Sequence, residues 1–288
     1  MKKARIDAVL AERGLFPSRS AAAGAVRAGE VRVGTDGPVA LRPSQLVEPE
    51  AEFVLQARPR FVSRGGTKLE NALAALGIDV AGRDCLDVGA STGGFTDCML
   101  QRGAARVAAV DVAYGQIDAR LRKDPRVTVI ERLNARALGP ADLPFLAALA
   151  TIDVSFISLT KVLPAVATCL APGGEALAMV KPQFELGRER VGRGVVRDPG
   201  DRQEAVLKVA LAARETGLPV RGIASSGLPG PKGNRETFVW CGGEGPELED
   251  LAGAIAAADA ASLGPATGED ADGAAGEADP RGPEGGDA

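Results

Sequence analysis

The sequence contains no histidine among its 288 residues, and aromatic side chains make up only 3% of it. The lack of histidine excludes histidine-based catalytic triads and histidine metal sites, so acid–base chemistry falls to Lys, Asp, Glu, Tyr or Cys. The shortage of aromatic residues argues against extended stacking on nucleic-acid bases. The four cysteines show no CxxC spacing, and two of them fall inside predicted strands, where a free thiol behaves as a small hydrophobe.

Long apolar runs are missing as well. No stretch of about 18 apolar residues is present, and the N-terminus lacks the apolar core of a signal peptide. We therefore expect a cytoplasmic protein that does not enter a membrane. The length favours one large domain plus a smaller one. We expect the protein to act as a monomer.

Charge is unevenly distributed along the chain, whose net charge is −4. Residues 242–288 contain 12 acidic residues and one basic residue, so residues 1–241 carry a net charge of +7. A basic body is compatible with a nucleic-acid partner, although many unrelated proteins share this property. Residues 261–288 have almost no large apolar side chain and are predicted to be a disordered acidic tail, with solvation as its default role.

Residues 1–58 have the pattern of a small α+β domain. Apolar residues recur at helical spacing over Ile6–Leu10 and over Ala22–Val26, and an alternating strand pattern begins after Gly29. Ser18 is placed to cap the second helix. Residues 59–61 are the expected linker to the rest of the chain.

Residues 62–260 alternate short apolar strands with amphipathic helices, which predicts a Rossmann-like α/β fold with a parallel sheet covered on both faces. Ligands bind at the carboxyl ends of the strands in such sheets. The predicted strands are Cys85–Val88, Arg106–Asp111, Val127–Glu131, Ala150–Asp153, Ala176–Lys181 and Phe238–Cys241. The predicted helices lie near Gly94–Arg102, Gln116–Arg122, Leu159–Leu170 and Arg202–Glu215.

A glycine-rich turn, DVGASTGGFT, follows the first strong strand. Glycine lets the backbone turn tightly and approach a ligand closely. Asp111 ends the next strand, where a carboxylate can accept both hydroxyls of a ribose. The GxSxGGF pattern suits the methionine part of S-adenosylmethionine better than a pyrophosphate. The predicted cofactor-binding residues are Asp87, Gly89, Ser91, Gly93, Gly94, Phe95, Asp111 and Asn134.

Each part of this cofactor site has a plain structural alternative. The glycines can form an ordinary turn, with Asp111 acting as a helix cap. The side-chain amide of Asn134, which follows the third strand, can meet the edge of an adenine or simply hold a turn.

Four ionisable residues stand close to strand ends: Lys68, Asp153, Lys181 and Glu236. An apolar run that ends on a lysine and is stopped by proline, as at Lys181, is a costly place for a charge. Taken singly, each residue is better explained as a capped or solvated strand end. Together they form an unusual set.

As a set, these four residues resemble the Lys-Asp-Lys-Glu tetrad of FtsJ-like ribose 2′-O-methyltransferases. The chain resembles the TlyA family more closely still, a family named both as haemolysins and as ribosomal RNA methyltransferases. The matching segments are SRGGTKLENAL, DVGASTGGFTDCML, DVAYGQ, DVSFISL, KPQFE and GNRETF. The N-terminal segments RIDAVLAERGLFPSRSAA and GEVRVG resemble the alpha-L RNA-binding motif. The resemblance covers about residues 3–243 and leaves the acidic tail unmatched.

The resemblance implies an S-adenosylmethionine-dependent enzyme that methylates a ribose 2′-hydroxyl of ribosomal RNA, free or in ribosomal subunits, with cytidine as the target. A free lysine has a pKa of about 10.4, which burial and a neighbouring ammonium group lower. Lys181, buried beside Lys68, is therefore the candidate base, while Asp153 and Glu236 orient the lysines and balance their charge. No metal is required.

Several arginines punctuate the N-terminal domain, and the start of its second helix favours phosphate. The predicted RNA-binding residues are Arg5, Ser18, Arg19 and Arg64, although a single arginine is usually part of a solvated face. Two alternative functions remain at this point: a membrane-lytic haemolysin and an RNA-binding protein without catalytic activity.

Overall fold

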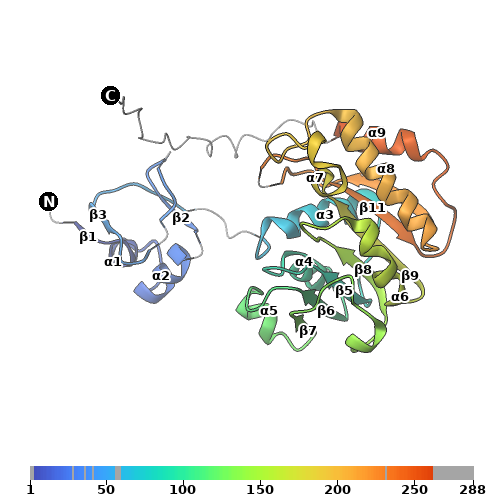
Figure 1. Cartoon of the computed structure of the whole chain (residues 1–288). Coiled ribbons are helices and arrows are strands. Elements are labelled where there is room, and N and C mark those ends of the chain that lie inside the picture. Colours follow the sequence, from blue (N-terminus) through green and yellow to red (C-terminus); the bar gives the residue numbers. More distant parts are fainter. Residues whose placement is uncertain are drawn as a thin grey trace, which may run out of the picture. The chain divides into compact units, whose positions relative to one another are not determined.

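The computed structural model describes residues 3–27, 29–35, 37–40, 42–55, 60–230 and 232–261. The chain divides into two compact units, residues 1–60 and 61–288 (Figure 1). Pro59 of the expected linker and residues 262–288 of the expected tail lie outside the described residues. Phe61, which we assigned to the linker, is buried in the core of the C-terminal unit, and Ala261 is the last residue of a helix rather than the first of a tail.

The N-terminal unit is a small α+β fold, as predicted. Its elements are β1 (Ala4–Arg5), α1 (Ile6–Glu12), α2 (Arg19–Arg27), β2 (Val31–Val33), β3 (Leu46–Val47) and β4 (Phe53–Leu55). β1 pairs with β3 and β2 with β4, both antiparallel. The residues with helical spacing, Ile6 to Leu10 and Ala22 to Val26, supply the buried core between the two helices. The Ser18 hydroxyl accepts a hydrogen bond from the Ala21 N–H (3.1 Å) and so caps α2.

The C-terminal unit is built on a seven-stranded sheet with the order β10-β11-β9-β8-β5-β6-β7. The strands are β5 (Asp84–Val88), β6 (Arg106–Asp111), β7 (Val127–Glu131), β8 (Ala147–Ile152), β9 (Leu170–Val180), β10 (Val220–Ser225) and β11 (Thr237–Gly242). The five strands from β9 to β7 run parallel, whereas β11 is antiparallel to both of its neighbours. The predicted Rossmann-like sheet is therefore present, with one reversed strand near its edge.

Helices cover both faces of this sheet, because alternate strand residues point to opposite sides. One core layer contains residues of α3 (Arg64–Leu76), α4 (Gly94–Gln101) and α5 (Ala119–Lys123). The other contains residues of α6 (Leu163–Thr168), α8 (Pro199–Glu215) and α9 (Leu251–Ala261). The short helices η1 (Pro140–Asp142), η2 (Leu159–Lys161), α7 (Pro182–Glu185) and η3 (Arg188–Arg190) lie in the connections.

Several element boundaries differ from the prediction, each for a local reason. β10 escaped prediction because its sequence VRGIAS mixes polar residues and glycine in an edge strand. The single helix expected over Leu159–Leu170 is split into η2 and α6, with Pro164 in the first turn of α6. The helix expected over Gln116–Arg122 begins only after Asp118, whose carboxylate accepts from the Arg120 N–H. None of the helices within the described ranges is long and apolar enough to cross a membrane.

Candidate active site

Two neighbouring clefts open at the carboxyl ends of the parallel strands. The larger, of about 1060 Å³, is lined by residues that include Asp111, Asn134 and Phe156. The smaller, of about 410 Å³, contains all four residues of the predicted tetrad. Gly89, Ser91 and Asp153 line both clefts. Because the clefts share these residues, a group bound in one lies next to a group bound in the other.

Asp111 stands at the end of β6, at the wall of the larger cleft. One carboxylate oxygen accepts a hydrogen bond from the Ser91 N–H and the other from the Ala113 N–H, each at 2.7 Å. These bonds fix the carboxylate and leave its remaining lone pairs directed at the cleft. A fixed carboxylate at this position can accept hydroxyl groups of a sugar.

The glycine-rich turn shapes the wall between the clefts. Gly89 and Gly93 have φ angles of +88° and +94°, in the left-handed region that favours glycine. A Cβ at Gly89 would clash with the carbonyl oxygen of Asp153, so glycine lets the turn approach the end of β8. Ser91 also has a positive φ (+48°), which a non-glycine residue adopts at some cost.

Four of the residues predicted for the cofactor site are buried: Asp87, Gly93, Gly94 and Phe95. Asp87 is fully buried and lines neither cleft, and its Oδ2 accepts from the Thr96 hydroxyl (2.6 Å). Burial raises the pKa of Asp87 to about 7. Phe95 is buried against Phe238, with ring centroids 5.9 Å apart, and only borders the smaller cleft. Gly94 is also buried and borders the smaller cleft, and a Cβ there would collide with the Ser63 hydroxyl.

Asn134 lines the larger cleft and also holds a turn. Its Oδ1 accepts from the Arg136 N–H (3.0 Å), so the turn geometry that we named as an alternative is present. The amide nitrogen has no bond among the described residues, which leaves its two hydrogens for a ligand. The two interpretations of Asn134 are therefore compatible.

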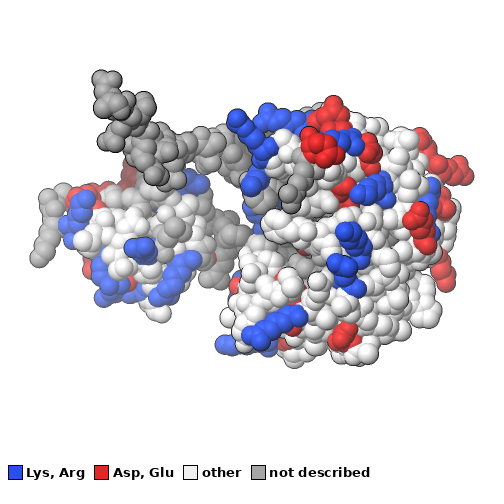
Figure 2. All heavy atoms as spheres, in the orientation of Figure 1, with Lys and Arg blue, Asp and Glu red and all other residues white. Residues whose placement is uncertain are grey.

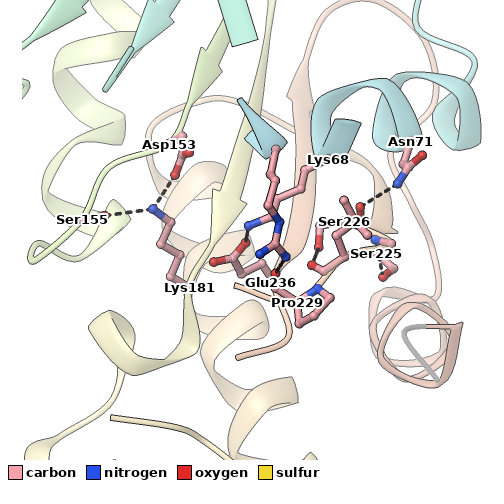
Figure 3. Close-up of polar contacts among 12 residues, drawn as sticks. Lys68, Asn71, Asp153, Ser155, Lys181, Ser225, Ser226, Pro229 and Glu236 are labelled. Carbon is pink, nitrogen blue, oxygen red and sulfur yellow. Dashed lines mark hydrogen bonds and ion pairs between the residues drawn. The ribbon is translucent and has the colours of Figure 1, made fainter. Parts of the chain in front are cut away.

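The tetrad forms two ion pairs at the smaller cleft (Figure 3). Lys68 Nζ lies 2.5 Å from Glu236 Oε2, and both side chains are buried. Lys181 Nζ lies 2.5 Å from Asp153 Oδ1 and donates to the Ser155 hydroxyl at 2.9 Å. The Lys181 side chain is 12% exposed, so it reaches the cleft without being fully enclosed.

The fold explains why residues so distant in sequence converge. Asp153 and Lys181 follow the adjacent parallel strands β8 and β9, so they emerge at the same edge. β11 runs antiparallel to β9 with Thr237 opposite Val180, which brings the residue before β11, Glu236, to that edge too. Lys68 reaches the cleft from α3.

We expected Lys181 to lie beside Lys68, with Asp153 and Glu236 balancing their charge. Both lysines line the smaller cleft, and each is paired with one of these carboxylates. The fold provides those partners because Asp153 and Glu236 sit at strand ends on either side of the cleft. Charge balance within the site is therefore pairwise.

The sequence analysis missed Phe156, which lines the larger cleft. Its side chain is 91% exposed, its φ is +64°, and its ring lies 5.1 Å from that of Phe184. A nearly bare aromatic ring on a strained backbone is unfavourable unless it serves binding. The segment DVSFISL, which begins at Asp153, was the signal available in the sequence.

The sequence analysis also missed Glu185, the last residue of α7. Its side chain attaches α7 to the loop that contains Asp153 and Phe156. Its buried carboxylate accepts from the Ser158 hydroxyl (2.5 Å) and from the Leu159 N–H (2.8 Å). Burial raises the pKa of this carboxyl. The loop after β8 and the segment after β9 are thereby held together.

The N-terminal unit places Arg5 and Arg19 around one carboxylate. Arg5 donates two hydrogen bonds to Asp7 (3.0 and 2.8 Å), and Arg19 Nη2 lies 3.6 Å from the same group. The Arg5 hydrogen bonds lower the pKa of Asp7. Asp7 is buried while both arginine side chains are about half exposed, so it presents them side by side at the surface. Arg64 belongs to the other unit, where it borders the smaller cleft and donates to the Pro229 carbonyl (2.7 Å).

Comparison with known proteins assigns both units to families. Residues 61–243 match the FtsJ-like methyltransferase family, and residues 4–53 match the S4 domain. The chain is 49% identical over 242 residues to the 16S/23S rRNA (cytidine-2′-O)-methyltransferase TlyA of Mycobacterium tuberculosis, covering 83% of this chain and 90% of that protein.

Two further relatives carry haemolysin names. Hemolysin A of Brachyspira hyodysenteriae is 35% identical, with 81% of this chain and 97% of that protein covered. A Streptococcus thermophilus protein of known structure is 39% identical with a TM-score of 0.68, covering 91% of this chain and 97% of its own.

Proposed function

The chain belongs to the FtsJ-like methyltransferase family, and we propose that it transfers a methyl group from S-adenosylmethionine to a ribose 2′-hydroxyl of ribosomal RNA. The observation that carries this proposal is the convergence of two lysines and two carboxylates next to a nucleoside-sized cleft. We further propose cytidine as the target, because the mycobacterial relative is named for it.

The larger cleft fits S-adenosylmethionine. Its volume of about 1060 Å³ is at the upper end of the range for small-molecule sites. The fixed carboxylate of Asp111 suits the ribose hydroxyls, and the free amide hydrogens of Asn134 suit the adenine edge. Gly89 lets the turn pack against the end of β8 at the boundary of the clefts. When bound, the cofactor supplies a methyl group that is already activated by a sulfonium.

The protein's own task is to position the ribose hydroxyl and to take its proton. Lys181 Nζ in its neutral form accepts that proton, and the ammonium so formed is stabilised by Asp153 at 2.5 Å and by Ser155. Lys68, held by Glu236, places a second positive charge where the oxygen becomes electron-rich. The two carboxylates orient the lysines rather than act as bases.

We propose that the S4 domain captures the RNA. In the C-terminal unit, the base of the target nucleoside would then stack on Phe156. The paired arginines Arg5 and Arg19 suit backbone phosphates, and the capped start of α2 lies beside them. The exposed ring of Phe156 offers a stacking surface at the edge of the methyl-donor cleft. We further propose that the protein acts as a monomer on ribosomes in the cytoplasm.

A labelled-methyl transfer assay tests the proposal. Purified protein is incubated with S-adenosylmethionine labelled in the methyl group and with unmodified 16S and 23S rRNA, free and in ribosomal subunits. We expect label in RNA, and none with the Lys181→Ala variant. Absence of transfer to every RNA, together with dye release from liposomes, would instead favour the activity behind the haemolysin names.

A further inference from the structure

Two loops of the C-terminal unit carry four cationic side chains that the proposed chemistry does not use. Arg193 and Arg197 lie between η3 and α8, and Lys232 and Arg235 lie between β10 and β11. Arg193, Arg197 and Lys232 are exposed, and Arg235 is half-buried. We call these four residues the cationic rim. Figure 2 shows Lys and Arg side chains gathered on this part of the unit, near α7 and the loops that follow it.

A buried asparagine holds the two loops together. Asn234 is 3% exposed, its Oδ1 accepts from the Val196 N–H (2.9 Å), and its Nδ2 donates to the Gly194 carbonyl (2.7 Å). The Lys232 side chain lies against Gly194, with Nζ 3.6 Å from the point that a Cβ there would occupy. The residue before Gly194, Arg193, has a φ of +47°. The buried amide of Asn234 thus joins the two loops that carry the cationic side chains.

These charges are not neutralised by the protein. None of the four rim side chains has an ion-pair partner within the residues that the structure describes. Arg190, a few residues earlier, is in contrast clamped between Asp201 and Glu204. The carboxylate of Asp198, next to Arg197 in the sequence, caps α8 and forms no ion pair with a rim residue among the described residues. Exposed cations without ion-pair partners of their own can bind the phosphates of a polyanion.

The rim adjoins the tetrad. Arg235 directly precedes Glu236, which is buried in the smaller cleft. At the other end of the same loop, the Pro229 carbonyl accepts from Arg64, which also lines that cleft. A polyanionic strand whose nucleotide occupies the smaller cleft would therefore meet the rim with its flanking phosphates.

We propose that the cationic rim is a second RNA-binding surface, on the catalytic unit itself, which holds the phosphate backbone next to the methylated nucleotide. This inference rests on the proposed function, since it takes the tetrad cleft as the site of the target ribose. The S4 domain then selects the RNA, and the rim fixes the strand at the site of chemistry.

Matched charge reversals test the rim in the full-length protein. Lys232→Glu and Arg193→Glu change rim residues, and Lys123→Glu is the control. Lys123 is likewise an exposed lysine without an ion pair among the described residues, but it ends α5 beside the far strand β7. Binding to unmodified 16S and 23S rRNA and to ribosomal subunits is measured at several salt concentrations, and calorimetric S-adenosylmethionine binding verifies the fold.

Each rim variant should lose about tenfold in RNA affinity, and the slope of log affinity against log salt should fall by about one. The Lys123→Glu control should lose no more than about twofold. Equal losses in rim and control variants, or an unchanged salt slope, would overturn the rim as a phosphate-binding surface. Methyl transfer by the wild type is assayed separately. If the wild type is active and the rim variants bind RNA as tightly as it does, the rim proposal is refuted and the proposed function is not. A wild type that binds RNA through the rim but transfers no methyl refutes the proposed function instead.

Discussion

The two clefts of the C-terminal unit differ in what builds them. The larger cleft depends on backbone N–H groups, those of Ser91 and Ala113, which fix one carboxylate, Asp111. The smaller cleft depends on charged side chains from four separate elements, joined as the pairs Lys68–Glu236 and Lys181–Asp153. One surface is shaped to bind, whereas the other concentrates groups that can move a proton.

This difference predicts how the two clefts respond to substitution. Loss of a binding group in the larger cleft weakens affinity for the methyl donor in proportion to the contact removed. Loss of the base in the smaller cleft stops chemistry while leaving binding intact. The substitutions described below test whether binding and catalysis are lost separately or together.

The largest effect is expected from Lys181→Ala. We expect turnover to fall by about a thousandfold or more, because general base catalysis and charge stabilisation are lost together. Affinity for S-adenosylmethionine, measured by calorimetry, should stay within about twofold. Lys181→Arg should be almost as inactive, since guanidinium remains protonated. An arginine variant with near-normal turnover would reduce Lys181 to an electrostatic role and erase the contrast between the clefts.

Removal of residues 1–60 should act on neither cleft directly, because both are lined by residues of the C-terminal unit. We expect the shortened protein to keep its affinity for S-adenosylmethionine and to lose nearly all methylation of ribosomal RNA at low RNA concentration. The reason is the loss of phosphate contacts around Arg5 and Arg19. Methylation by the shortened protein at the wild-type rate would show that the S4 domain is dispensable for capture.

Asp111→Ala should weaken S-adenosylmethionine binding by about 1.5–3 kcal/mol, which is roughly 10- to 150-fold, as for loss of a charged hydrogen-bond partner. Asp111→Asn, which retains one acceptor and the local shape, serves as the milder control. Turnover at saturating cofactor should fall far less than in Lys181→Ala. If calorimetry shows unchanged affinity for S-adenosylmethionine in both variants, the assignment of the cofactor to the larger cleft is wrong.

The effect on activity is smallest for Asp87, which lies inside the fold rather than in either cleft, and its substitution is expected to change stability instead. Its folded pKa of about 7 exceeds the unfolded value of about 4, so the folded state binds the proton more tightly. The stability that this carboxyl contributes is present below about pH 4 and is lost as pH rises towards 7. Relative to wild type, Asp87→Asn should gain about 1 kcal/mol of unfolding free energy per pH unit across that window. Denaturant unfolding at several pH values measures this, and a constant difference would contradict it.

The sequence predicted the architecture well where apolar runs are interrupted by glycine or charge. β6 and β7 have the expected bounds, and the residues that follow β8 and β9 emerge at one edge because parallel strands must end there. The position of Glu236 in the cleft could not be predicted from the periodicity of apolar residues, because it depends on β11 being antiparallel. Only the family resemblance put this residue in the tetrad.

Other features of the site escaped prediction because they depend on packing. A motif position does not tell whether Asp87 faces a ligand or the interior, and here it faces Thr96. The exposure of Phe156 follows from a positive φ in an irregular loop, which residue pattern does not encode. The pairing of each lysine with a carboxylate likewise appears only when four elements meet.

The position of the transferred methyl group tests the central claim most directly. Ribosomal RNA labelled by the wild-type protein is hydrolysed in alkali, which needs a free 2′-hydroxyl to cleave the chain. If the protein methylates a ribose 2′-oxygen, the label will appear in alkali-resistant dinucleotides whose 5′ nucleoside is cytidine. Label recovered in mononucleotides would place the methyl group on a base and contradict the account.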